Sequence, residues 1–137
     1  MIDRRSMLAG TAALAATPVF AAKPKPFNPA FPQGFLWGAS TAGHQIEGNN
    51  TASDLWFLEN QQPTIFAQPS GDAANSFLLW ERDLDLAKSI GLNTYRFSLE
   101  WARIEPEQGL FSIAMLDHYK AMIAGCRARG LTPVVTF

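Results

Sequence analysis

A small group of polar side chains follows the first apolar stretch of the sequence. Residues 35–41 mix aromatic, apolar and small residues, as is typical of a buried parallel strand. Gln45 and Glu47 come just beyond its carboxyl end, which is where α/β proteins bind ligands. An amide can exchange hydrogen bonds with hydroxyl groups, and a carboxylate can accept or move protons. Two interpretations are open: the pair binds a ligand, or it caps backbone groups in a buried loop.

The next predicted strand carries further candidates. Residues 94–101 alternate and are rich in aromatic residues, with Arg96 inside the strand and Glu100 near its end. Glu47 and Glu100 would then lie at the ligand end of neighbouring strands, where paired carboxylates can do acid and base chemistry. Acids are seldom fully buried without a partner. We therefore expect Glu100 at the surface or in an ion pair, with substrate contact as the alternative.

The apolar pattern predicts two helices that position these residues. Spacings of three and four predict a helix over residues 73–90, which Gly91 ends. Ser112 is the predicted N-cap of a second helix, which runs to Gly130. The two buried faces are expected to consist of Phe77, Trp80, Leu84, Ala87 and Ile90, and of Met115, Tyr119, Met122, Ile123 and Cys126.

Strands and loops account for the rest of the chain. Residues 132–137 are apolar and β-branched, which predicts a third strand. Residues 103–108 are expected to form a loop that Gly109 closes. Residues 49–72 form a connection long enough to be a functional loop, with one short helical turn at residues 55–58.

The alternating order of strands and helices indicates right-handed crossovers and a parallel sheet, which places the chain in the α/β class. Three parallel strands cannot cover both faces of their sheet, and the last strand would be a bare apolar edge. A closed barrel of eight strands takes ~250 residues. We therefore expect residues 33–137 to be the N-terminal portion, about three β/α units, of an incomplete (β/α)8 TIM barrel.

The amino terminus predicts an export signal. Residues 1–21 combine Arg4 and Arg5 with an apolar stretch and a small-residue cleavage site that ends at Ala21. The paired arginines resemble a bacterial twin-arginine signal, and a Sec-type signal or an uncleaved anchor are the alternatives. Residues 22–32 hold four prolines and are expected to form a linker. We predict export to the bacterial periplasm or secretion.

Composition and charge narrow the kinds of partner. The net charge is −1 and no run of Lys or Arg exceeds two residues, so neither a nucleic-acid footprint nor a basic membrane patch is visible. Cys126 is the single cysteine and allows no internal disulfide. His44 and His118 lack a second ligand at metal-binding spacing, so we predict no metal and no cofactor. We expect a small-molecule partner and no stable membrane association after signal cleavage. The sequence indicates no particular oligomeric state.

Three stretches of the sequence carry a family pattern. They are Phe31-Pro-Gln-Gly-Phe-Leu-Trp-Gly-Ala-Ser-Thr-Ala with Gln45-Ile-Glu-Gly48, then Tyr95-Arg-Phe-Ser-Leu-Glu-Trp-Ala-Arg-Ile104 with Pro106, then Leu116-Asp-His-Tyr119 with Arg129-Gly-Leu-Thr-Pro-Val-Val-Thr136. Together they span most of residues 31–137. They resemble glycoside hydrolase family 1, the β-glucosidase family, and the second also resembles related glycosidases that share the barrel.

The resemblance implies roles for three of the polar residues. Gln45 is similar to the residue that hydrogen-bonds the outer hydroxyls of the sugar in the cleavage subsite, where an amide can accept from one hydroxyl and donate to its neighbour. Arg96 resembles the arginine that keeps the nucleophilic carboxylate ionised and oriented, and an ion pair between two strands is the structural alternative. Glu47 resembles the family's supporting carboxylate, and we favour a buried structural acceptor for it.

Other positions depart from the family pattern or are aromatic. His44 stands where the family usually has an aromatic residue, commonly Tyr, and Glu100 replaces the usual Ser. These two departures suggest a branch with altered sugar or aglycone preference. Trp37 and Trp101 are expected chiefly in the core, although either could flank the sugar, because aromatic faces are good platforms for sugars.

The resemblance implies retaining hydrolysis of a β-glycoside, in which one glutamic acid protonates the leaving oxygen and a second glutamate, ~5 to 5.5 Å away, attacks the anomeric carbon. In the family these glutamates follow the fourth and seventh strands, so neither is in this chain, and we reject Glu47 and Glu100 as substitutes. Residues 22–137 alone are expected to be inactive and poorly folded. A non-catalytic carbohydrate-binding barrel and a glycosidase of another family in the clan are the alternatives.

Overall fold

The computed structural model describes residues 30–137. The predicted export signal, residues 1–21, and most of the predicted linker lie outside the described residues. Residues 32–137 form one compact unit, and the fold described below is that unit.

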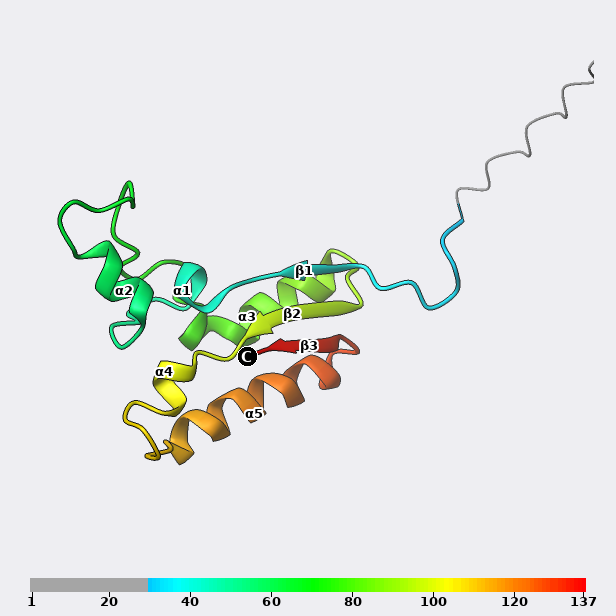
Figure 1. The fold of residues 1–137 in the computed structure, drawn as a ribbon. Coiled ribbons are helices and arrows are strands. Elements are labelled where there is room, and N and C mark those ends of the chain that lie inside the picture. Colours follow the sequence, from blue (N-terminus) through cyan, green and yellow to red (C-terminus); the bar gives the residue numbers. More distant parts are fainter. Residues whose placement is uncertain (1–29) are drawn as a thin grey trace, which may run out of the picture. The chain divides into compact units, whose positions relative to one another are not determined.

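Three parallel strands form the sheet, in the order β1 (Gly38–Ser40), β2 (Thr94–Ser98) and β3 (Thr132–Thr136). Ser40 pairs with Arg96, and Arg96 pairs with Val134, so these three residues lie in one row across the sheet. The strands run side by side with α5 alongside β3 (Figure 1). The predicted parallel sheet with helical connections is confirmed.

Two long helices bury one face of this sheet. Helix α3 (Ser76–Ser89) and helix α5 (Ile113–Ala128) pack on each other, and Tyr95 and Phe97 of β2 point into the core beside them. Because side chains alternate along a strand, Arg96 between these two residues faces the other way and is exposed. The buried core consists of Leu84, Ala87, Tyr95, Phe97, Ile104, Tyr119, Met122, Cys126 and Leu131.

The first strand is shorter and more exposed than predicted. Strand β1 covers only Gly38–Ser40, and all three of its residues are exposed. The prediction of a buried strand over residues 35–41 is therefore wrong in this structure. The physical reason is that β1 is an edge strand whose outer side is not covered by any element of the described residues.

The end of the second predicted strand is a helix. Strand β2 stops at Ser98, and Trp101–Ile104 form helix α4, so both the strand over residues 94–101 and the loop from Arg103 are corrected. Glu100 causes the change, because its side chain accepts a hydrogen bond from the Ala102 backbone N–H and caps the helix.

The first predicted helix is also shorter than expected. It begins at Ser76 because Ala73 and Asn75 have positive φ angles, of 45° and 53°, which an α-helix does not allow. It ends at Ser89, so Ile90 leaves the buried stripe and is 67% exposed. Gly91 has φ of +89° and terminates the helix, as predicted.

The second predicted helix is confirmed. The Ser112 side chain accepts a hydrogen bond from the Met115 backbone N–H, and the helix begins at the next residue, Ile113. Tyr119, Met122 and Cys126 are buried on its inner face, as their spacing predicted.

Two short helices follow β1. They are α1 (Gly43–Ile46) and α2 (Asp54–Glu59), and α2 confirms the predicted helical turn at residues 55–58. In the described part of the chain, no helix combines the length and apolar character needed to cross a membrane.

Candidate functional site

Helix α1 places Gln45 at the carboxyl end of β1. Two residues separate the strand from this single turn, whose N-cap residue Ala42 makes no side-chain capping hydrogen bond. Gln45 is exposed, and its side-chain amide makes no hydrogen bond with any residue in the range 30–137, although its backbone N–H donates to the Ala42 carbonyl oxygen. Its neighbours His44 and Glu47 are buried. The amide of Gln45 is therefore available to a ligand, while the residues on either side hold the backbone.

Glu47 is a buried acceptor. Its side chain is 4% exposed, Arg103 Nε donates to Oε2 at 3.0 Å, and the Tyr119 hydroxyl donates to Oε1 at 2.9 Å. Burial raises the pKa of Glu47 above its usual value, and the hydrogen bonds from Tyr119 and Arg103 oppose that rise. Arg103 also donates to the Gly48 carbonyl oxygen at 2.7 Å and lies over the Phe77 ring. These contacts fix the end of α1.

Glu100 lies in the same network. Its Oε2 accepts a hydrogen bond from Asn50 Nδ2, its Oε1 accepts from the Ala102 backbone, and its own N–H donates to the Tyr119 hydroxyl oxygen at 3.1 Å. The expectation of a surface or ion-paired Glu100 is wrong, because this side chain is half-buried and its partners are neutral. Both Glu47 and Glu100 are therefore held by internal partners and are not placed as an acid and nucleophile.

Arg96 links all three strands. Nη1 donates to Ser40 Oγ at 2.8 Å and Nε donates to Thr136 Oγ1 at 3.0 Å. The ion pair between strands that was the structural alternative for Arg96 does not form among the described residues, and hydrogen bonds to hydroxyl groups of both neighbouring strands take its place. The guanidinium thus lies on the exposed face of the sheet, held in place and without a carboxylate partner among the described residues.

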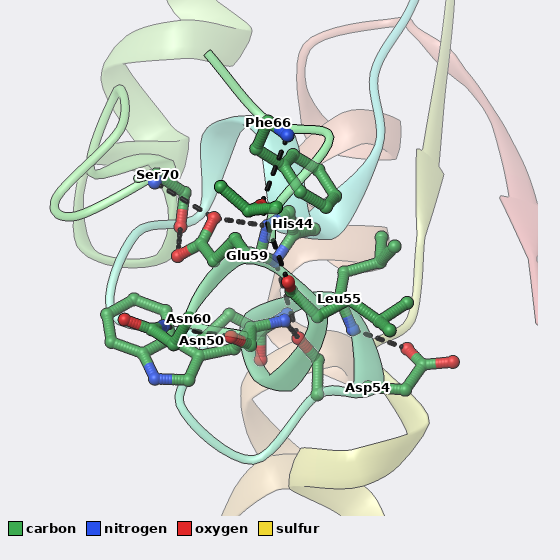
Figure 2. A network of polar contacts seen from close by, with 12 residues as sticks. His44, Asn50, Asp54, Leu55, Glu59, Asn60, Phe66 and Ser70 are labelled. Carbon is green, nitrogen blue, oxygen red and sulfur yellow. Dashed lines mark hydrogen bonds and ion pairs between the residues drawn. The ribbon is translucent and has the colours of Figure 1, made fainter. Parts of the chain in front are cut away.

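His44, which departs from the family pattern, is the centre of a buried polar group. Its Nε2 lies 3.1 Å from Glu59 Oε2 and its Nδ1 lies 3.3 Å from Ser53 Oγ. Glu59 also accepts hydrogen bonds from the Ser70 backbone N–H at 3.0 Å and hydroxyl at 2.9 Å (Figure 2). Burial alone would raise the pKa of Glu59, but the hydrogen bonds from Ser70 and His44 hold it below its usual value.

No metal site accompanies these groups. Within residues 30–137, no three or more His, Cys, Asp or Glu side chains are arranged to hold a metal ion. The chemistry that this corner offers is hydrogen bonding by an exposed amide and charge stabilisation by a fixed guanidinium.

A family model, Glycosyl hydrolase family 1, matches residues 27–137. The chain belongs to glycosyl hydrolase family 1. The resemblance seen in its three sequence stretches is thereby confirmed, and so is the expected α/β portion of the family's barrel.

Relatives of this family 1 chain are similar over a limited part of their length. A crystal structure of a β-glycosidase is 61% identical with a TM-score of 0.76, over 78% of this chain and 26% of that one. The β-glucosidase of Agrobacterium sp. is 40% identical over 113 residues, which are 77% of this chain and 25% of the relative. A rice protein named "Probable inactive beta-glucosidase 14" is 37% identical over 115 residues, 77% of this chain and 22% of the relative. The chain spans about a quarter of the length of the curated relatives that it matches.

The structure separates the two tryptophans of this family 1 chain. Trp37 precedes β1, so it lies at the opposite end of that strand from Gln45, with its ring 4.8 Å from that of Phe35. Trp101 opens α4 and donates from Nε1 to Glu105 Oε2 at 2.7 Å. They are 48% and 47% exposed, so the expectation that both are chiefly core residues is wrong.

The His44 group was missed although the sequence held a signal for it. Residues 45–80 contain four acidic residues and no Lys or Arg, so a buried acid in this segment has few cationic partners close in sequence. His44 stands immediately before the segment and replaces the family's usual aromatic residue. A histidine in an aromatic position beside a segment with unpaired acids is the pattern that could have indicated the His44–Glu59 contact.

Proposed function

We propose that the protein hydrolyses the glycosidic bond of β-glucosides or related small β-glycosides with retention of configuration, and that this chain supplies part of its sugar-binding site. The observation that carries the proposal is Gln45, whose exposed side-chain amide has no partner among residues 30–137 and follows the carboxyl end of a strand in a family 1 chain. That end of the strands is where barrel enzymes bind their substrates.

Gln45 and Arg96 have different tasks in this proposal. The amide of Gln45 binds neighbouring outer hydroxyls of the sugar, donating to one and accepting from the other. Arg96 stands beside the nucleophilic carboxylate, where its positive charge favours the ionised form. The two reacting carboxyl groups of a retaining enzyme lie ~5 to 5.5 Å apart. Neither is Glu47 or Glu100 in our account, because internal hydrogen bonds occupy both.

The direct test is turnover by the polypeptide that the gene encodes. We expect release of the aryl group from an aryl β-glucoside, with NMR showing that the first sugar product is the β-anomer. Absence of turnover by a folded protein, or a first product of inverted configuration, would contradict the proposal.

A non-catalytic carbohydrate-binding protein is the second candidate. This candidate is favoured by the 37% identity to the rice relative, whose name calls it a probable inactive β-glucosidase. Similarity over this stretch is therefore found both in relatives named as β-glucosidases and in a relative named as inactive. Saturable binding of a β-glucoside without turnover, measured by calorimetry, would select this candidate.

We also propose that the protein is exported through a twin-arginine signal that is cleaved after Ala21. The support is the order of Arg4 and Arg5, an apolar stretch and small residues in the sequence. Replacing both arginines with lysine is expected to retain the precursor in the cytoplasm, whereas the unchanged protein is recovered outside it with Ala22 as its new amino-terminal residue. N-terminal sequencing of the exported protein distinguishes these results, and an intact Met1 would contradict the proposal.

A further inference from the structure

Gln45 lies between two buried anchors. On its carboxyl side, Glu47 is held by Arg103 and Tyr119. On its amino side, His44 is held by the group that we call the His44 clasp, namely His44, Ser53, Glu59 and Ser70. We infer that His44 and Glu59 are positioning residues that fix Gln45 toward the sugar and so set how strongly the enzyme distinguishes sugars by their outer hydroxyls. This inference rests on the proposed function of Gln45.

The clasp fixes the orientation of the His44 ring. Both ring nitrogens are engaged, Nε2 with Glu59 and Nδ1 with Ser53, at 3.1 and 3.3 Å. The Glu59 carboxylate is itself held at both oxygens by Ser70. Phe66 places its ring edge-on to the imidazole, with the ring centroids 6.4 Å apart. Because both ring nitrogens have a buried partner, the imidazole is a fixed point for the backbone that carries it.

Helix α1 depends on such fixed points. It has four residues, and a single turn of helix is not stable by itself, because ordering its backbone costs more than its few hydrogen bonds return. Its N-cap contributes no side-chain hydrogen bond. The orientation of Gln45 is therefore determined by the side chains next to it, and His44 is its immediate neighbour.

The loop that presents Glu59 is closed at its base. Asn49 Nδ2 donates to Asp72 Oδ1 at 2.6 Å, and the Asn49 N–H donates to the Gly71 carbonyl oxygen at 2.8 Å. Gly48 has φ of +79°, and a Cβ there would collide with the Asp72 carbonyl oxygen, so only glycine allows this close approach. Residues 49–72 thus hold Glu59 in a defined position against α1 rather than closing over it as a lid.

His44 departs from the residue type that the family pattern usually has at this position. Where the family usually carries an aromatic residue, His44 adds two directed hydrogen bonds to a position that packing alone would otherwise hold. Hydrogen bonds are directional, whereas packing of an aromatic ring tolerates small rotations. We therefore expect sugar discrimination in this protein to depend on a contact between α1 and α2.

The test compares two substrates and two kinds of variant in the polypeptide that the gene encodes. His44→Leu removes both ring contacts, His44→Gln keeps an N–H donor toward Glu59, and Glu59→Gln keeps the size of the acid without its charge. Asp85→Asn is the matched control, since it breaks the ion pair between Asp85 on α3 and Arg129 at the end of α5, which involves no residue of α1. The substrates are an aryl β-glucoside and its 4-deoxy analogue, which lacks one outer hydroxyl.

For His44→Leu we expect kcat/KM on the glucoside to fall roughly 10- to 100-fold, as small displacements of a binding group commonly cause. The fall on the 4-deoxy analogue should be much smaller, because the lost contact is already absent there. His44→Gln should retain most of the activity, and Glu59→Gln should show a weaker form of the same selective loss. Equal losses on both substrates, or no rescue by His44→Gln, would overturn the inference in favour of a merely structural role.

Amide hydrogen exchange separates this inference from the proposed function. The Gln45 and Glu47 amides donate to the Ala42 and Gly43 carbonyl oxygens, and His44→Leu should accelerate their exchange together with that of Ser70. Asp85→Asn should leave all three unchanged. If the unchanged protein hydrolyses no glycoside, the proposed function fails, but the exchange rates still show whether the His44 clasp orders α1. Unaltered exchange at residues 45 and 47 in His44→Leu would overturn it.

Discussion

Two regions of this family 1 chain are held by different interactions. Between the sheet and helices α3 and α5, apolar side chains pack around the buried residues Leu84 and Cys126. At the carboxyl end of β1, buried polar side chains form the contacts, namely Glu47 with Arg103 and His44 with Glu59. Packing is largely non-directional, whereas hydrogen bonds fix orientation. Both regions therefore contribute to stability, and the polar region also sets the geometry of Gln45.

Removing Arg103 should give the largest loss of stability, because it leaves Glu47 buried without its cation. We expect Arg103→Ala to lower the free energy of unfolding by about 3–5 kcal/mol near neutral pH, as loss of one partner of a buried pair typically does. Urea unfolding of the polypeptide that the gene encodes measures the change, with Arg127→Ala, at an exposed position on α5, as a matched control. A change no larger than that of the control would show that the polar region contributes little to stability.

Leu84→Ala tests the packed region. Leu84 is 1% exposed, so the substitution should cost about 2–5 kcal/mol of unfolding free energy through lost burial and the cavity that remains. Leu86→Ala, on the same helix but 61% exposed, should cost far less. The comparison also predicts that Leu84→Ala leaves discrimination between sugars unchanged. Altered discrimination would contradict the assignment of the geometry of Gln45 to the polar region.

The two buried acids should have opposite effects on the pH dependence of stability. The pKa of Glu47 is raised, so the folded state binds the carboxyl proton of Glu47 more tightly than the unfolded state does. The stability gained from this tighter proton binding is lost as pH rises through the folded pKa, above 4.5. The pKa of Glu59 is lowered, so its contribution is present above 4.5 and is lost as pH falls through the folded pKa.

Glutamine variants isolate these two contributions. Relative to the unchanged protein, Glu47→Gln should gain stability toward neutral pH and lose it toward acid, and Glu59→Gln should do the reverse. Urea unfolding from about pH 3 to about pH 7 spans both windows. For each variant, the difference in unfolding free energy from the unchanged protein is plotted against pH. Slopes of the same sign for the two variants would contradict the environments assigned to Glu47 and Glu59.

The packed region could be predicted from the sequence because its signals are local. The spacing of Tyr119, Met122 and Cys126 gave the buried face of α5, and Ser112 gave its first turn. Boundaries failed where a single side chain decides them: Glu100 caps α4 and ends the strand early, and Asn75 delays α3 by its positive φ.

The polar region was harder to predict because its contacts join residues far apart in sequence. Glu47 meets Tyr119 across 72 positions, and Asn50 meets Glu100 across 50. No local periodicity encodes such pairs. The position of Gln45 after a strand was visible from the sequence, but the anchors on either side of it were not.

The most direct test of sugar binding by Gln45 is the effect of Gln45→Ala on kcat/KM for an aryl β-glucoside, in the polypeptide that the gene encodes. Gln61→Ala, which removes another exposed amide in the 49–72 connection, is the matched control. We predict that Gln45→Ala lowers kcat/KM about tenfold or more, equivalent to ~1.4 kcal/mol of transition-state binding, with an unchanged melting temperature. A loss no greater than that of Gln61→Ala would contradict the claim that this corner of the chain binds the sugar.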